Sequence, residues 1–422
     1  MSILKVNKLR DTAGSTDAIT LDPNGGAVLA GVTTVTSVKV GAAVTISESG
    51  IEASGIGITC ASINGTQIGG RRNLIINGAM NVAQRGTSST TAGIKTVDRF
   101  RGDWSGTDEA PTQAQVDLSS SDTPYTLGFR KSLKITNGNQ TSGAGAGDFI
   151  GIDTNLEAQD IANSGWNYTS TSSFVTLSFW VKSSVAQNFY GYLFTSDGTS
   201  QIYPFETGSL TADTWTKITK TIPGNSNLTF DNDTGAGLQL QLWAFLGTTY
   251  TDSGVSLNQW AAFASGTRDP DNTSTWYTTN DATFEITGVQ LEVGSQATPF
   301  EHRSFGEELA LCHRYVYVIN VQTSAIVDRN YSFTTSSSNM DAIFYMPTPM
   351  RSSPTYTGTA TDVRFISGNN SNDFHLDTIA ALYSSTGNDT WSGNTSVSSV
   401  ADKCPGVLYG TEDGTIIFSA EL

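Results

Sequence analysis

Alternation of apolar and polar residues, the two-residue period of a β-strand, runs through the middle of the chain. In GLQLQLWAFLG (237–247), the pattern assigns residues 238, 240, 242, 244 and 246 to one face and Gln239, Gln241, Trp243 and Phe245 to the other. In SFVTLSFWVKS (173–183), one face carries Val175, Leu177, Phe179 and Val181. Many short strands that end in turn residues predict an antiparallel β-sandwich or jelly roll over residues 73–305.

The segment FEITGVQLEVG (284–294) alternates on both sides of Gly288, but the phase slips by one residue there. A glycine at a phase slip inside a strand is typical of a β-bulge. The sequence therefore predicts a bulge at Gly288.

A short helix is predicted after residue 304. Ser304 and Glu307 have the spacing of a capping box, and EELALCHRY continues with apolar residues at helical spacing. Alternation returns in YVYVIN (315–320), and further strand patterns lie at 341–350, 362–368 and 414–422. We therefore place a boundary near Phe305 and predict a second, smaller β-domain over residues 306–422.

The first 70 residues have a different pattern. β-Branched residues alternate with small polar ones, and isoleucines recur every two to five residues with Gly or Ser between them, at positions 46, 51, 56, 58, 63 and 68. Such short strands bury little alone and gain stability when several chains wind together or coils stack. An intertwined β-rod over residues 31–72 is expected; a flexible Gly/Ser linker is the alternative.

Composition agrees with an all-β chain. Charged residues make up 15% of the 422 residues, and apolar residues make up 37% with 42 glycines, a balance that favours strands over helices. The net charge is −16, distributed as +1 over residues 1–72, −10 over 73–305 and −7 over 306–422. An acidic surface repels phosphate backbones, so nucleic-acid binding is not expected.

Motifs of export, membrane insertion and catalysis are missing from the sequence. MSILKVNKLRD (1–11) lacks a signal-peptide layout, and no apolar run reaches the roughly 18 residues of a membrane span. We expect synthesis in a cytoplasm and no membrane insertion.

Cys60, Cys312 and Cys404 have neither metal-site nor disulfide-framework spacing. No nucleophile elbow, zinc motif or nucleotide loop occurs, so neither enzymatic activity nor a cofactor is expected.

Two acidic pairs are weak calcium candidates. Asp231 and Asp233 flank Asn232, and Asp269 and Asp271 flank a proline. Carboxylate and amide oxygens are the ligands that Ca²⁺ prefers, but neither pair has the twelve-residue EF-hand layout. Turn formation by Asp and Asn is the alternative interpretation.

Aromatic residues in polar loops are the candidate binding residues. Two predicted loops, 366–377 and 384–394, place Phe374, His375 and Trp391 among Asn and Asp. A flat ring suits the face of a sugar, while amides and carboxylates suit its hydroxyls. Trp243 is a fourth candidate because it lies opposite the leucine face of its strand. Anchoring of these rings in a core or between chains is the alternative.

Several stretches resemble a known family. The segment RRNLIINGAMNVAQRGTS (71–88), which we term the collar, and VDRFRGDW (97–104) resemble a region common in tail-fibre proteins of tailed bacteriophages. Residues 284–315 are similar to the end of the fibre's jelly roll, which resembles a carbohydrate-binding module, and to the helix after it. Residues 4–26 and 344–356 resemble the start and the C-terminal β-domain of such fibres.

The resemblance implies a homotrimeric structural fibre in the virion. Residues 1–30 would attach to a phage tail or baseplate protein, 31–72 would form the stem, and the β-domains would bind host-surface polysaccharide. Collar residues Asn73, Asn77, Asn81 and Arg85 would fix the chain path where the rod ends. A virion-bound polysaccharide depolymerase and a purely structural tail or head-decoration protein are the alternatives.

Overall fold

The computed structural model describes most of the chain from residue 72 onward. Its described ranges are 8–10, 17–21, 27–29, 37–40, 44–47, 50–53 and 72–422, apart from 324–326, 328–329, 337–338, 359–362, 368–369, 376–380, 385–389, 397–404 and 411–412. Two compact units divide between Ala61 and Ser62. No helix among the described residues is long and apolar enough to cross a membrane.

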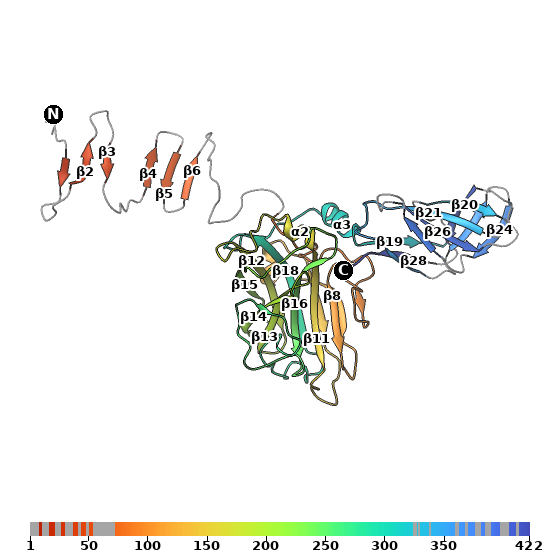
Figure 1. Cartoon of the computed structure of the whole chain (residues 1–422), viewed down its shortest axis with the longest axis horizontal. Coiled ribbons are helices and arrows are strands. Elements are labelled where there is room, and N and C mark those ends of the chain that lie inside the picture. Colours follow the sequence, from red (N-terminus) through yellow and green to blue (C-terminus); the bar gives the residue numbers. More distant parts are fainter. Residues whose placement is uncertain are drawn as a thin grey trace. The chain divides into compact units, whose positions relative to one another are not determined.

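The first unit contains two three-stranded antiparallel sheets (Figure 1). One consists of β1 (Lys8–Arg10), β2 (Asp17–Leu21) and β3 (Ala27–Leu29), and the other of β4 (Ser37–Val40), β5 (Val44–Ser47) and β6 (Gly50–Ala53). Strands in this part of the chain agree with the β-pattern of the sequence. Winding of several chains into a rod stays a prediction.

The second unit begins with a sandwich of two six-stranded antiparallel sheets. The first sheet has the order β15 (Thr216–Pro223), β12 (Phe174–Ser183), β18 (Thr283–Val293), β10 (Lys131–Thr136), β9 (Thr112–Asp117), β7 (Ser88–Ser89). The second has the order β17 (Ala261–Ala262), β14 (Gln201–Ser209), β13 (Asn188–Thr195), β16 (Ala236–Leu246), β11 (Phe149–Glu157), β8 (Arg101–Ser105). Two short helices, α1 (Thr123–Thr126) and α2 (Ala158–Ala162), lie in the connections.

The predicted core faces of the sandwich are confirmed in two strands. Val175, Leu177 and Phe179 of β12 are fully buried and share one hydrophobic cluster with Leu240 of β16. The outer face of each sheet, opposite this core, therefore carries the alternate residues.

Two residues of β16, Phe245 and Leu246, lie on the opposite faces from their prediction, and Leu246 packs in the outer cluster with Trp243. The register between β11 and β16 shifts between Ile150 and Gly151, which pair with Phe245 and Trp243. Ala244 is the extra residue of this bulge, so alternation restarts after it. Phe245 consequently enters the sandwich core and stacks on Tyr277, with ring centroids 4.6 Å apart.

The bulge predicted at Gly288 is confirmed. Opposite Gly288 the register between β12 and β18 shifts between Ser178 and Trp180, and the glycine has φ +63°. This left-handed conformation is strained for any residue with a Cβ atom. The bulge keeps Ile286 and Val289 in the core on either side of the slip.

Collar residue Asn73 forms a buried link to β18. Its Nδ2 donates to the Val289 carbonyl at 3.0 Å, and its Oδ1 accepts from the backbone N–H groups of Ile75 and Leu291 at 3.0 and 3.1 Å. An amide that bonds through both ends holds the start of the collar against β18.

Asn77, four residues later, also holds the chain in place through its side-chain amide. It has φ +61°, which asparagine tolerates better than most residues, and it is fully buried. Its Nδ2 donates to the carbonyls of Val82 and Asp98 at 2.8 and 2.9 Å. Hydrogen bonds of Asn73 and Asn77 thus fix the path of the collar, while the rod predicted before it stays a prediction.

The helix predicted after residue 304 is confirmed as α3 (Phe305–His313), with both hydrogen bonds of the Ser304–Glu307 capping box. Immediately after it, Arg314 and Tyr315 bind the buried Glu157 of β11. Arg314 Nε and Nη2 donate at 2.6 and 2.7 Å, and Tyr315 Oη donates at 2.6 Å. Burial acts to raise the pKa of Glu157, but these hydrogen bonds outweigh it, and the pKa is lowered.

Two more antiparallel sheets follow α3. One has the order β19 (Val316–Val321), β28 (Gly414–Ser419), β22 (Thr355–Gly358). The other has the order β24 (Asn370–His375), β23 (Val363–Ser367), β27 (Pro405–Gly410), β20 (Asn330–Ser336), β21 (Asn339–Tyr345), β26 (Thr390–Ser396), β25 (Ala381–Ser384). The strands predicted near 341–350, 362–368 and 414–422 are therefore present.

The loop assignment of three candidate binding residues is wrong. Phe374 and His375 lie in β24, and Trp391 lies in β26. Phe374 pairs with Phe365, and Trp391 pairs with Phe344. Ladder hydrogen bonds to neighbouring strands outweigh the local turn preference of Asn and Gly here.

The end of the sequence contacts the collar. Glu421, just after β28, forms ion pairs with Arg85 and Arg99, and the Leu422 carbonyl accepts from Asn155 Nδ2 at 3.1 Å. Residues on both sides of the boundary near Phe305 thus belong to one compact unit.

Candidate functional site

A cleft with a volume of about 440 Å³ lies on the outer face of the first sheet. Trp180 of β12 and Gly288 of β18 form its floor, with Phe129 after α1 and Phe300 and His302 after β18 around them. Segments far apart in sequence therefore supply its rings. We term it the aromatic cleft.

The bulge glycine makes room for these rings. A Cβ atom at Gly288 would lie 2.7 Å from Phe129 Cζ and 3.2 Å from Trp180 Cδ1. The first distance is shorter than real carbon contacts allow. Glycine at this position thus satisfies both the backbone conformation and the shape of the cleft floor.

Three rings pack against one another at one wall. Phe129 lies 4.8 Å from Phe300 in an edge-to-face arrangement and 5.0 Å from His302, and the last two rings are 5.0 Å apart. His302 Nε2 lies 3.0 Å from the Leu127 carbonyl, and Leu127 is 52% exposed at the rim. Mutual packing holds the apolar wall in place.

The segment that carries Phe300 is fixed to the sheet beneath it. Thr298 N donates to Glu292 Oε1 at 2.8 Å, and Glu301 N donates to Gln290 Oε1 at 2.8 Å. Glu301 in turn accepts from Asn73 N at 2.7 Å. Such a wall loses little conformational entropy when a ligand binds.

Polar groups surround the apolar surface. Lys217 of β15 is exposed, while Ser178 is buried at the floor and His302 is exposed at the wall. Ammonium, hydroxyl and imidazole groups beside a half-exposed indole can bind a ligand with both apolar faces and hydroxyls, as a sugar ring has. No Asp or Glu lines the cleft, so it contains no carboxylate pair for hydrolysis.

Of the binding candidates from sequence, Trp243 is the one whose side chain the structure describes. It is 3% exposed and packs between Phe149 and Tyr192, with ring centroids 5.6 and 6.2 Å away. It lies on the outer face of the second sheet, away from the aromatic cleft. The side chains of Phe374, His375 and Trp391 lie outside the described part, so their role in binding stays a prediction.

The first calcium candidate lies in an exposed turn. Asp233 Oδ1 accepts from Gly235 N at 2.9 Å, and Asp231 N donates to Asp197 Oδ2 at 3.0 Å. The contact of Asp233 is the local hydrogen bond of a turn-forming Asp.

The two aspartates of the second calcium candidate differ in burial. Asp271 is exposed and accepts from Thr251 Oγ1 at 2.8 Å, whereas Asp269 is fully buried and neither of its carboxylate oxygens has a protein partner. Burial raises the pKa of Asp269 well above its usual range. Within the described ranges, no group of three or more acidic, His or Cys residues could hold a metal ion. Structural calcium stays a prediction.

The cleft residues were missed from sequence for different reasons. Alternation in β12 already places Trp180 opposite the core, so its exposure could have been predicted. Phe129 and His302 meet it only through contacts between distant segments, which local patterns do not encode.

No family model and no curated protein matches this chain. Among solved structures, it is similar to a protein of Bacteroides thetaiotaomicron provisionally described as sugar-binding, with 12% identity and a TM-score of 0.27 over 52% of this chain and 99% of that one.

A second similar structure is Clostridium thermocellum endo-1,4-beta-D-xylanase 10B, whose CBM22-1 and GH10 modules were complexed with xylohexaose. The identity is 9% and the TM-score 0.24, over 53% of this chain and 30% of that one. An exo-beta-agarase matches with 8% identity and a TM-score of 0.26, over 76% of this chain and 44% of that one. TM-scores below 0.5 do not indicate a common fold, so these likenesses carry no argument about function.

Proposed function

We propose that this chain binds glycans without cleaving them, and that the aromatic cleft is the binding site. The observation that carries the proposal is the half-exposed Trp180 in the floor of the cleft, next to a fixed aromatic wall and with an ammonium and a hydroxyl beside it. The volume of about 440 Å³ falls within the usual range of ligand sites.

The biological setting that we propose is the tail fibre of a tailed bacteriophage. Support comes from the resemblance of the collar and of residues 284–315 to such fibres. Residues 1–30 would attach to a tail or baseplate protein of the virion, and the chain would assemble as a homotrimer through residues 31–72. Light scattering should then give three times the 44.8 kDa mass of one chain. A folded monomer would contradict the fibre.

Binding without cleavage agrees with the lining of the cleft. Glycosidases use a pair of carboxylic acids, and the aromatic cleft has none among its lining residues. Incubation with the polysaccharide that it binds should release no new reducing ends. Release of oligosaccharides would favour a depolymerase.

Substitution of Trp180 tests the site. Full-length protein would be applied to an array of defined neutral oligosaccharides, and Trp180→Ala should reduce binding at least roughly tenfold through loss of the stacking surface. Trp260→Ala is the matched control, because Trp260 is also partly buried but packs on the core and donates to the Pro223 carbonyl at 2.7 Å. Equal binding by both variants would remove the aromatic cleft as the site.

A further inference from the structure

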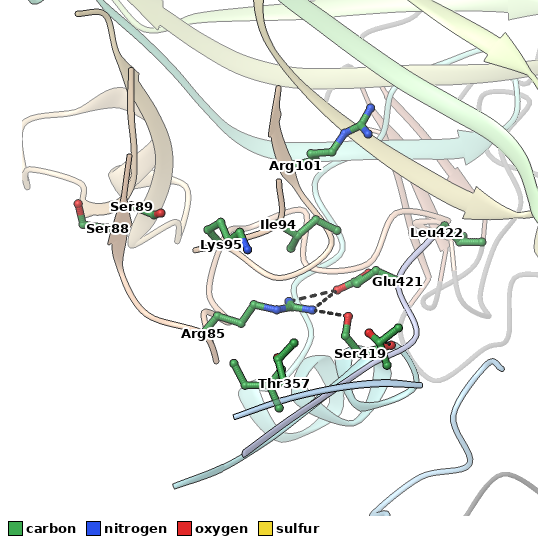
Figure 2. Close-up of a pocket in the computed structure, with 12 residues that line it drawn as sticks. Arg85, Ser88, Ser89, Ile94, Lys95, Arg101, Thr357, Ser419, Glu421 and Leu422 are labelled. Carbon is green, nitrogen blue, oxygen red and sulfur yellow. Dashed lines mark hydrogen bonds and ion pairs between the residues drawn. The ribbon is translucent and has the colours of Figure 1, made fainter. Parts of the chain in front are cut away.

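A second cavity, with a volume of about 510 Å³, lies between the collar side of the sandwich and the sheet of β22 and β28. Figure 2 shows Arg85, Lys95 and Arg101 on different segments around it, with Arg85 extended toward Glu421 and Ser419. We term it the basic cavity.

The charge of the lining is opposite to that of the whole chain. Three cationic side chains and one acidic side chain, that of Glu421, line the basic cavity, whereas the chain has 23 cationic and 39 acidic residues. Because cations gather here in an acidic protein, the cavity attracts an anion that the rest of the surface repels.

Glu421 can balance the charge of one of the two guanidinium groups that it contacts. Both terminal nitrogens of Arg85 lie 3.3 Å from Glu421 Oε1, while Arg99 takes the other oxygen. One carboxylate thus serves two guanidinium groups. Asp98 is a more distant neighbour, 3.6 Å from Arg85 Nη1, and burial raises its pKa to about 6.

The other two cations are accessible. Arg101 is 41% exposed and uses Nε to bind Asp153 at 2.7 Å, with Asp103 at 3.4 Å from Nη2. Lys95 is exposed, and within the described residues no carboxylate lies in ion-pair range of its ammonium. Lys95 is therefore the cation most available to a ligand.

Hydroxyl groups complete the lining. Ser88, Ser89, Thr355 and Thr357 face the same cavity, with Ile94, Ile417 and Leu422 as its apolar part. Hydroxyls can donate to and accept from the hydroxyls of a sugar, and the isoleucines can contact the carbon face of its ring. Bare inorganic anions would leave most of these groups without a role.

We infer that the basic cavity binds an acidic sugar unit through its carboxylate or phosphate group. Lys95 and Arg101 bind the anion, Arg85 supports it, and the hydroxyl groups bind the ring. This site is separate from the aromatic cleft, so the inference does not depend on the proposed function.

Calorimetry on the full chain tests the inference, with glucuronic acid, glucose 6-phosphate, glucose and inorganic phosphate as separate probes. At low ionic strength either acidic sugar should bind more tightly than glucose. Binding of the carboxylate sugar alone or of the phosphate sugar alone identifies the anion. Equal affinity for inorganic phosphate and glucose 6-phosphate would overturn the sugar part, and no binding of either acidic sugar would overturn the whole.

Two variants locate the site. Lys95→Ala should weaken binding of the acidic sugar roughly tenfold, the loss expected for one charge-assisted contact. Lys220→Ala is the matched control and should bind as the parent does, because Lys220 lies on β15, at the opposite edge of the first sheet from β7. Equal weakening in both variants would contradict the site. Trp180→Ala should leave acidic-sugar binding unchanged, which separates failure here from failure of the aromatic cleft.

Discussion

Gly288 lies directly beneath Trp180: a Cβ atom on the glycine would come within 3.2 Å of Trp180 Cδ1. The same bulge that maintains the core pattern of β18 therefore shapes the floor of the aromatic cleft. One residue therefore determines both the sheet geometry and the shape of the cleft floor.

Substitution of Gly288 should consequently damage both stability and binding. Gly288→Ala imposes a side chain at φ +63° and moves Phe129, whose Cζ would lie 2.7 Å from the new Cβ. We expect a loss of about 1–3 kcal/mol in the free energy of unfolding and weaker glycan binding. Gly143→Ala is the control, since Gly143 has φ +78° but no atom within 4 Å of an added Cβ. Chemical denaturation should show the larger loss of unfolding free energy for Gly288→Ala. Binding to the array should be weaker for Gly288→Ala and unchanged for Gly143→Ala.

The buried amide of Asn77 should be more important for stability than the neighbouring collar asparagine. Asn77→Ala removes three hydrogen bonds, two to the Val82 backbone and one to the Asp98 carbonyl. Buried backbone groups would be left unpaired, so we expect a loss of about 2–4 kcal/mol. Asn81→Ala, at a partly exposed position, should cost less than about 0.5 kcal/mol. Similar melting temperatures for the two variants would contradict this assignment.

Local patterns predicted the elements better than their assembly. Alternation in β12, the slip at Gly288 and the Ser304 cap are encoded within a few residues, and all three are present. Phe245 and Leu246 were placed on the wrong faces because a bulge at Ala244 depends on the partner strand β11.

Placement of Trp391 in a loop failed for a related reason. Its neighbours Asn, Asp and Gly favour turns, but pairing with β21 extends the chain through it. The aromatic cleft requires Phe129 and Phe300 to meet, which follows from tertiary packing alone.

The leucine face of β16 provides a direct test of the sandwich. Leu240 is 2% exposed, so Leu240→Asp would place a carboxylate in the core with no cationic partner. We expect destabilisation by several kcal/mol. Thr219→Asp, on the exposed side of β15, introduces the same group into solvent and should change the unfolding free energy by no more than about 0.5 kcal/mol. An unchanged melt for Leu240→Asp would refute the core assignment.

Asp153 should make the protein less stable as the pH rises. Burial raises the pKa of its carboxyl from 3.8 to about 7, although Arg101 Nε lies 2.7 Å away. A raised pKa means that the folded state holds the proton more tightly than the unfolded state. The resulting stabilisation is complete below pH 3.8 and is lost as the pH rises through about 7. At roughly 1.4 kcal/mol per pKa unit, the loss is up to ~4 kcal/mol.

Asp153→Asn removes the titrating group, so the unfolding free energy of this variant should fall less steeply between about pH 4 and 8. Asp117→Asn is the control, because that side chain is 80% exposed. Parallel pH profiles for the parent and Asp153→Asn would show that Asp153 does not titrate in this range.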